Sequence, residues 1–407
     1  MSQTAIEMAD IIRHCGDAFL ARFGHRISLH QRRVLFDIAN CRTAAMGGHV
    51  EVCDTCGTQR NAYNSCRNRH CPKCMGSARW RWTAQREAEL LPVPYFHVVF
   101  TLPHLLAPLA LANPRVVYDL LFRATAETLR EVAADPKHLG ASVGFLAVLH
   151  TWGQKLNHHP HIHCIVPAGG LSPDQTRWVP ASETFFLPNK VLSRVFRGKF
   201  LDLLYRSFAV GELTLTGQLT SLGPRLAFKR YLKRAKSQDW VVDSRRPFGG
   251  PEVVLRYLAR YTHRVAIANS RLVDLVDGRV RFRYKDYADD NRWKTLSLTG
   301  VEFIRRFLLH VLPPGFTRIR YYGFLANRGR TERLQRCRQL LGDASPPALS
   351  TLESSAEATD ESAAGSGEHP LRCPHCGRGQ MRVLRASPRR FVSPQVLFGP
   401  VAAWDTS

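Results

Sequence analysis

Two histidines separated by one residue are the side chains in this sequence best placed to hold a metal ion for chemistry. They belong to the segment HTWGQKLNHHPHIH, residues 150–163. Alternate side chains of a β-strand share a face, so His161 and His163 should project together while Ile162 points into the core. Two imidazoles on one strand, with a third ligand from a neighbouring strand, leave a divalent ion open on its other side. Such an ion can polarise a phosphodiester.

The third ligand could come from the apolar run VGFLAVLHTW, which precedes the histidine pair and should form the partner strand of a hairpin. If the loop is centred on residues 156–157, His150 lies opposite the pair. Gln154 is the alternative third ligand. His158 and His159 are expected in the loop, as loop residues or substrate contacts.

Two tyrosines four residues apart could act as nucleophiles. Tyr257 and Tyr261 lie in the helix-like segment PEVVLRYLARYTHRVAIAN, in which Pro251 suits the first helical position. Residues four apart share one helix face. Tyrosines at this spacing are ordinarily packing residues. The functional hypothesis is that the phenol oxygen of one tyrosine attacks the phosphorus of a phosphodiester. The resulting covalent phosphodiester would conserve the energy of the broken bond for later rejoining, and two phenols on one face could act in turn.

Two CxxC pairs predict a structural metal site near the N-terminus. Cys53 and Cys56 precede Cys71 and Cys74 by a short segment, and two such pairs can close a tetrahedral thiolate site around zinc. Four thiolates leave no open position, so catalysis at this site is not expected. Four further donors nearby could be extra ligands or form a second site: Cys41, His49, Cys66 and His70.

These candidates divide among regions of different composition. Residues 1–50 have helical periodicity, a β-rich run begins at Tyr95, and further helical and strand-like segments follow up to the double proline at residues 313–314. We therefore predict an α+β fold. The expected domains are a helical and zinc-binding domain (1–92), a catalytic domain (93–342), a disordered acidic linker (343–370) and a tail with a single CxxC (371–407).

The charge of the chain indicates nucleic acid as its partner. Lys and Arg number 57 against 33 Asp and Glu, a net charge of +24, and 47 of the basic residues are Arg. Guanidinium groups pair with phosphates and stack on bases. The candidate DNA contacts, some interleaved with Trp80 and Trp82, are Arg67, Arg69, Arg79, Arg81, Arg256, Arg260, Arg264 and Lys285.

The chain has neither a signal peptide nor a run of 18 apolar residues, so we expect a cytoplasmic protein with no membrane partner. In a reducing compartment its 11 cysteines are better explained as metal ligands than as disulfides.

Taken together, HPHIHC (159–164) and YLARYTHR (257–264) resemble the HUH and paired-tyrosine motifs of two-tyrosine rolling-circle transposases of insertion sequences, the group with an N-terminal zinc-binding domain. Segments such as SCRNRHCPKC, FRYKDY and RIRYYGFLANR are similar to that family as well. The resemblance extends from about residue 10 to 340 and includes the tail motif CPHCG.

The resemblance implies an antiparallel HUH sheet with helices on one face, preceded by a zinc-ribbon-like domain. His161 and His163 would bind catalytic Mg²⁺ or Mn²⁺, in addition to structural Zn²⁺. Tyr257 and Tyr261 would form 5′-phosphotyrosines with single-stranded DNA at element ends and target site. Such a bacterial enzyme would be nucleoid-associated when bound to DNA. The resemblance does not identify the third metal ligand or the oligomeric state.

Three alternative functions stay open at the level of sequence. A rolling-circle replication initiator or a relaxase would share the chemistry but not the biology. A non-catalytic zinc-ribbon DNA-binding protein would form no covalent adduct with DNA. A hydrolytic metallonuclease would need no tyrosine and would leave a free 5′-phosphate.

Overall fold

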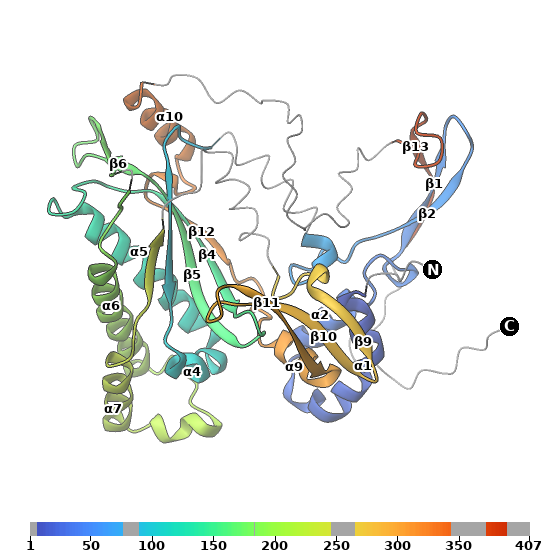
Figure 1. The fold of residues 1–407 in the computed structure, drawn as a ribbon, viewed down its shortest axis with the longest axis horizontal. Helices are drawn as coiled ribbons and strands as arrows, with labels where there is room; N and C mark the ends of the chain where they lie inside the picture. Colours follow the sequence, from blue (N-terminus) through green and yellow to red (C-terminus); the bar gives the residue numbers. More distant parts are fainter. Residues whose placement is uncertain (1–5, 76–88, 183, 246–264, 343–371, 389–407) are drawn as a thin grey trace.

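The computed structural model describes residues 6–75, 89–182, 184–245, 265–342 and 372–388. Within these ranges, a five-stranded sheet and a three-stranded sheet, each packed against helices, form two neighbouring bodies (Figure 1). A second three-stranded sheet projects at one end, beyond the helices of the smaller body. The combination of helices with antiparallel strands confirms the α+β prediction.

The larger body is built on an antiparallel sheet with the strand order β12-β4-β5-β3-β8. Its centre is the hairpin of β4 and β5, and β3 pairs with the other side of β5. Branched and aromatic residues dominate these strands, as expected for a pleated, largely buried surface. The strands are β3 (Tyr95–Thr101), β4 (Phe145–Trp152), β5 (His158–Pro167), β8 (Val242–Arg245) and β12 (Ile319–Tyr322).

Helices cover one face of this sheet, as predicted. Phe96, Val98 and Phe100 of β3 share one buried core with Ile162 and Cys164 of β5 and with the apolar sides of the helices. Complete burial of such side chains contributes about 1.5–3 kcal/mol each. The helices are α4 (Ala107–Ala112), α5 (Pro114–Ala134), α6 (Asn189–Ala209) and α7 (Arg225–Lys236).

Among the described residues, an apolar cluster covers one end of the opposite face of the sheet. There, Leu146 and Ile165 pack with residues 90–93 and with Leu334 and Cys337 of α10 (Arg330–Leu340). The short strands β6 (Gly169–Leu171) and β7 (Trp178–Pro180) pair at the same edge of the body. The histidine-bearing ends of β4 and β5 lie outside this apolar cluster.

The smaller body joins segments from both halves of the chain. Phe19 and Ile38 of the N-terminal helices share a core with Phe282 and Phe303. Segments between Ala266 and Leu308, which the predicted domain boundaries assign to the catalytic domain, therefore pack against the N-terminal helices. The elements are α1 (Met8–Phe23), α2 (Leu29–Ala39), β9 (Leu272–Val276), β10 (Arg279–Asp286), β11 (Arg292–Thr299) and α9 (Gly300–Leu308).

Local capping explains where two of these helices begin. The Ser28 side chain accepts a hydrogen bond from the backbone of Gln31, whose side chain accepts one from Ser28 N, a capping box at the start of α2. At α9, Thr299 Oγ1 accepts a hydrogen bond from Glu302 N. Both caps satisfy backbone donors that a helix start leaves without an intrahelical partner.

The projecting sheet has the strand order β13-β1-β2 and combines the two ends of the sequence. Its strands are β1 (Gly48–Cys53), β2 (Gln59–Tyr63) and β13 (Met381–Ser387). β13 pairs antiparallel with β1 from Gly48 opposite Ser387 to Cys53 opposite Met381. The predicted domain boundaries separate the tail from the zinc-binding domain. In the structure, the tail supplies the third strand of that domain's sheet (Figure 1).

The prediction that His158 and His159 lie in the hairpin loop is wrong, because β5 already begins at His158. The loop comprises only residues 153–157, closed by a 3.0 Å hydrogen bond from Gly153 N to Asn157 O. The predicted tyrosine helix and the predicted acidic linker (343–370) lie outside the described residues.

Candidate functional site

Three imidazoles converge at the hairpin of β4 and β5. His150 lies directly opposite His161 in the strand register, and His163 follows two residues later on β5, although the loop is centred on residue 155 and not on residues 156–157 as predicted. Each of the three offers a ring nitrogen within 4.8 Å of the others'. His150 and His163 are buried and His161 is half-buried. The sheet therefore assembles a three-nitrogen donor set of the kind that holds a divalent ion.

The alternation of the strands places these imidazoles on the face away from α5 and α6. Ile162, between the two histidines of β5, is buried in the core that includes those helices. His161 and His163 consequently project from the other face. The sequence prediction of a shared face for the two histidines agrees with this geometry.

Neighbouring groups orient two of the imidazoles. His163 Nδ1 lies 2.7 Å from Nε2 of His97 on β3, and His161 Nδ1 lies 2.6 Å from the carbonyl oxygen of His159. Burial lowers the pKa of His97 to about 4, so its ring is neutral near pH 7 and can accept a hydrogen bond. With Nδ1 engaged in both rings, Nε2 is the nitrogen with which each would bind a metal.

The position of Gln154 argues against the alternative third ligand. Its amide nitrogen donates to Tyr287 Oη at 2.9 Å, and its amide oxygen accepts from the backbone of Lys285 at 3.4 Å. Gln154 thus connects the loop to β10, and both polar atoms of its amide are engaged there. This arrangement favours His150 as the third ligand.

Groups from the smaller body hold the loop of the hairpin. Leu156, fully buried in that body's core, has a φ of 58°, unusual for a residue other than glycine. Its carbonyl lies 3.3 Å from His310 Nε2, and the carbonyl of Gln154 accepts from Arg271 at 2.6 Å. Arg306 donates to Lys155 O at 3.1 Å. These contacts fix the loop, and with it the register that brings the imidazoles together.

His158 has a structural environment of its own. Its Nε2 lies 2.8 Å from the phenol oxygen of Tyr118, and its ring stacks with that of His310 at 6.4 Å between centroids. Burial lowers the pKa of His158 to about 3. His158 therefore connects α5 and the smaller body to β5.

Several predicted site residues lie outside the described ranges. They are the two tyrosines, the arginines that flank them and the basic and aromatic residues after the cysteine segment: Arg79, Trp80, Arg81, Trp82, Arg256, Tyr257, Arg260, Tyr261 and Arg264.

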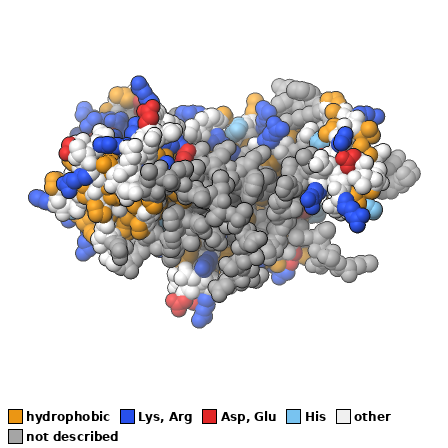
Figure 2. Space-filling model, turned by 90° about the horizontal axis from the view of Figure 1, so that it is seen from above, with side chains coloured by type: hydrophobic (Ala, Val, Ile, Leu, Met, Phe, Trp, Pro, Cys, Tyr) orange, Lys and Arg blue, Asp and Glu red, His pale blue; other side chains and the backbone are white. Residues whose placement is uncertain are grey.

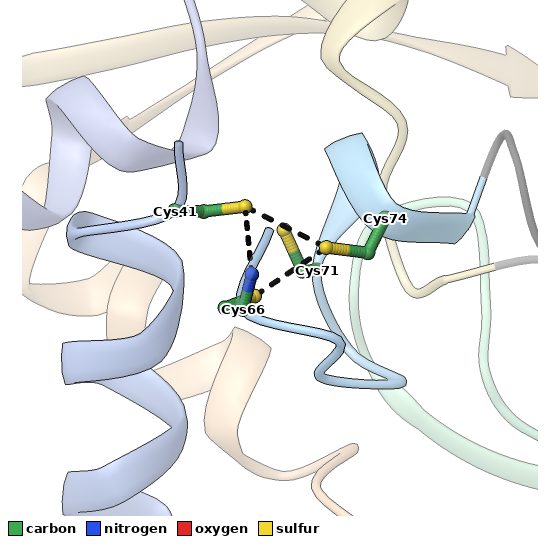
Figure 3. Close-up of side chains that lie close together, drawn as sticks. All are labelled: Cys41, Cys66, Cys71 and Cys74. Carbon is green, nitrogen blue, oxygen red and sulfur yellow. Dashed lines mark hydrogen bonds between the residues drawn. The ribbon is translucent and has the colours of Figure 1, made fainter. Parts of the chain in front are cut away.

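Four cysteines near the end of α2 point their sulfur atoms toward one another (Figure 3). Cys41 Sγ and Cys66 Sγ each lie 3.5 Å from Cys74 Sγ, and Cys71 completes the group. Hydrogen bonds from the neighbouring thiols lower the pKa of Cys74, while those to Cys41 raise the pKa of Cys66. Four converging sulfurs become stable thiolates together only around a cation, and this donor set fits zinc.

The prediction that the two N-terminal CxxC pairs form one site is wrong, because each pair belongs to a different group of four cysteines. Cys71 and Cys74 group with Cys41 and Cys66, whereas Cys53 and Cys56 group with Cys373 and Cys376 of the tail. The reason is topological, because β1 and β2 carry Cys53 and Cys56 into the projecting sheet. The predicted extra ligands His49 and His70 belong to neither group.

Both of those histidines have partners elsewhere. His49 Nε2 lies 2.9 Å from a carboxylate oxygen of Glu51. The buried His70 accepts a hydrogen bond at 3.4 Å from Leu312 N, and burial lowers its pKa well below the usual value. His70 thus helps to attach the cysteine segment to the chain after α9.

The candidate DNA contacts that the structure describes differ in environment. Arg67 is exposed, whereas Arg69 donates to Phe316 O at 2.5 Å and to Pro313 O at 3.2 Å. The geometry favours a structural role for Arg69. Lys285 is half-buried on β10, one residue from Tyr284. On the face seen in Figure 2, Lys and Arg side chains occur at both ends of the described surface with few acidic ones among them.

Sequence reasoning missed His97 and the complete ligand groups of the cysteines. The signal for His97 is its position in YFHVVFT, where strand alternation separates it from Phe96 and Val98 in the core. For the cysteines, the signal is the likeness of CDTCG (53–57) to CPHCG (373–377). Among the described residues, no helix combines the length and apolar character needed to cross a membrane.

Comparison with known proteins agrees with this architecture. Residues 11–102 match the family described as "Transposase zinc-binding domain", and residues 144–333 match a family described as "Putative transposase". The chain is 53% identical over its full 407 residues to a "Putative transposase" of Sinorhizobium fredii (strain NBRC 101917 / NGR234), covering all of that protein. It is 31% identical over 340 residues, 83% of this chain and 79% of the other, to the "Transposase for insertion sequence element IS801" of Pseudomonas savastanoi pv. phaseolicola.

No solved structure matches the chain significantly. The two family matches and the zinc-type cysteine cluster define the protein as a transposase. It belongs to the IS91/IS801 family of insertion-sequence transposases.

Proposed function

We propose that this transposase nicks and rejoins single-stranded DNA at the ends of its element and at the target site, with Tyr257 and Tyr261 as nucleophiles. The observation that carries the proposal is the convergence of three imidazoles, His150, His161 and His163, on the face of the central sheet away from α5 and α6. Family membership makes DNA the substrate class.

The donor set supports a divalent cation. A cation bound by these imidazoles would withdraw negative charge from the scissile phosphate and lower the barrier to attack. Three nitrogen ligands fit a transition ion such as Mn²⁺ better than Mg²⁺, which prefers oxygen donors. His97, through its contact with His163 Nδ1, keeps that ring in the orientation that binding requires.

In the proposed reaction, a tyrosine oxygen attacks the scissile phosphorus. A bond forms between the phenol oxygen and phosphorus, the bond from phosphorus to the 3′ oxygen breaks, and the leaving 3′ oxygen takes up a proton as the phenol loses one. The products are a 5′-phosphotyrosine and a 3′-hydroxyl. Because the number of phosphoester bonds is unchanged, a new 3′-hydroxyl can reverse the step without ATP.

The alternatives differ in their products. Membership of the transposase family favours transposition over plasmid replication or conjugation as the biological role. A hydrolytic nuclease would release a free 5′-phosphate, and a non-catalytic DNA-binding protein would leave the strand intact. Only tyrosine attack links the DNA covalently to the protein.

The proposal is tested by incubating the protein with Mn²⁺ and single-stranded DNA of an element end, labelled on the 3′ side of the cleavage site. We expect a labelled band that survives denaturation and disappears after protease treatment. The Tyr257→Phe and Tyr261→Phe double variant should form no adduct, whereas each single variant keeps cleavage and loses complete strand transfer. An adduct in the double variant would place the nucleophile elsewhere.

A second arm tests the metal ligands. Replacing His161 and His163 by Ala should abolish adduct formation and leave DNA affinity nearly unchanged, because basic surface residues supply most of that affinity. The exposed His138→Ala variant is the matched control and should cleave normally. Cleavage by the double variant at the control rate would exclude these histidines as ligands.

A further inference from the structure

We propose that Cys53, Cys56, Cys373 and Cys376 form a second zinc site, which fastens the C-terminal tail to the hairpin of β1 and β2. We call this site the terminal clasp. Neither family match covers the tail, since the zinc-binding match ends at residue 102 and the transposase match at residue 333. The inference is independent of the proposed DNA chemistry.

The spacing of the sulfurs fits a tetrahedral metal. Cys53 Sγ lies 3.8 Å from Cys376 Sγ, and Cys56 Sγ lies 3.7 Å from Cys373 Sγ. In a regular tetrahedron with zinc–sulfur bonds of about 2.3 Å, the sulfurs are about 3.8 Å apart. A disulfide requires about 2.05 Å between sulfurs, so these pairs are not bonded to each other.

The two CxxC segments form turns with the same hydrogen bonds. Gly57 N donates to Cys53 O at 3.1 Å, and Gly377 N donates to Cys373 O at 2.9 Å. Both glycines have a positive φ, 70° and 65°, which a residue with a Cβ adopts at a cost. The two halves of the terminal clasp therefore have the same turn geometry.

Backbone amides point at the sulfurs in both turns. Thr55 N lies 3.4 Å from Cys53 Sγ, and His375 N lies 3.4 Å from Cys373 Sγ. Gly379 N donates to Cys376 Sγ at 3.4 Å. Hydrogen bonds to a thiolate stabilise its charged form, which is the form that binds zinc.

The projecting sheet has almost no apolar core to replace a metal. Among the described residues, its buried cluster contains Cys53, Cys373 and Met381, with Cys376 packed against them. Val383 and Leu384 of β13 are 62% and 60% exposed. A small sheet with so little buried apolar surface is marginal in water, and a structural metal is the usual remedy.

The pairing of tail and hairpin is close and specific around the cysteines. Asp54 accepts a hydrogen bond at 2.8 Å from Gln380 N, and Asp54 N donates to Gln380 O at 3.0 Å. A Cβ at Gly379 would approach Cys53 Sγ to 2.4 Å. The tail therefore fits against the first CxxC turn only with glycine at position 379, and the two halves of the donor set meet as one site.

Zinc stoichiometry tests the terminal clasp directly. Native mass spectrometry of the full chain should show one zinc ion more in the wild type than in the Cys373→Ser, Cys376→Ser double variant. His375→Ala, between the same two cysteines, is the matched control and should keep the wild-type zinc content. Equal zinc in the wild type and the double variant would overturn the proposal, as would iron in place of zinc.

A second experiment needs no cysteine substitution. A protease site is inserted between residues 343 and 371, and the folded protein is cut there. We expect the tail fragment to co-elute with the rest of the chain on size exclusion and to separate when a zinc chelator is added. A tail that separates without chelator, or stays bound after zinc has left, contradicts the proposal. Neither result depends on DNA cleavage, so failure here is distinct from failure of the tyrosine mechanism.

Discussion

His97 on β3 and His163 on β5 lie side by side with parallel rings, 6° between planes and 5.0 Å between centroids, and their facing nitrogens are 2.7 Å apart. Because His97 is buried and neutral, it can accept the Nδ1 proton of His163. The contact selects the His163 tautomer that presents Nε2 as a ligand.

Removing that contact should weaken metal binding without changing the fold of the sheet. We expect His97→Phe, which keeps an aromatic ring and loses the acceptor, to need about 10- to 100-fold more Mn²⁺ for half-maximal cleavage. His97→Gln, whose amide oxygen can accept the same proton, should recover part of the loss. Metal titrations of single-strand cleavage measure both effects. An unchanged Mn²⁺ requirement in His97→Phe would show that His97 serves packing alone.

The cysteine cluster at the end of α2 should contribute to stability through zinc. Cys41→Ser removes a buried sulfur that contacts Cys74, so we expect the loss of one zinc ion and a fall in unfolding free energy of about 4 kcal/mol or more. Urea denaturation and metal analysis check the two effects. Cys337→Ser, at a buried cysteine outside both clusters, is the control and should retain all bound zinc.

His310 should make the protein less stable in mild acid. Burial lowers its folded-state pKa to about 4, below about 6.5 in an unfolded chain. Above pH 6.5 both states are neutral and the full stability is present. As the pH falls toward 4, only the unfolded state gains the proton, so this residue removes up to about 3 kcal/mol.

The comparison that isolates this effect uses His310→Gln, which does not titrate and can still donate to Leu156 O. Urea denaturation at pH 7.5 and pH 5 gives the stability difference between wild type and variant at each pH. We expect the wild type's advantage to shrink at pH 5. A pH-independent difference would mean that His310 is protonated in the folded state as readily as in the unfolded one.

Arg67 and Arg69 should respond differently to the same substitution. Arg67 is exposed, and if it contacts a phosphate, Arg67→Gln should reduce the salt slope of single-stranded DNA binding by about 0.7. Arg69→Gln removes hydrogen bonds to Phe316 and Pro313 carbonyls, so it should lower thermal stability and leave the slope unchanged. Fluorescence anisotropy at several salt concentrations and thermal melting distinguish the two outcomes. A reduced slope in Arg69→Gln alone would reverse the assignment.

Much of the architecture could be predicted because its signals are local. The N-terminal helices α1 and α2, the strand β3 that begins at Tyr95 and the strand carrying His161 and His163 follow from side-chain periodicity, which reports which face of an element is buried. That His150 lies opposite the histidine pair was also predicted, but from a loop centred one to two residues too late, because the register of a hairpin depends on its short loop. The DNA partner class followed from net charge and from the likeness of the motifs to a transposase family.

Contacts between distant segments were decided by the tertiary structure alone. The sequence by itself determined that the cysteines occur in CxxC pairs. Two residues between the cysteines are enough for a turn that directs both sulfurs to one metal ion. The sequence did not determine which pairs meet: Cys71 and Cys74 join Cys41 and Cys66, while Cys53 and Cys56 join the tail. Likewise, His97 reaches His163 only because β3 pairs with β5. Pairings across such separations depend on how strands and helices bury their apolar faces together, which no local pattern records.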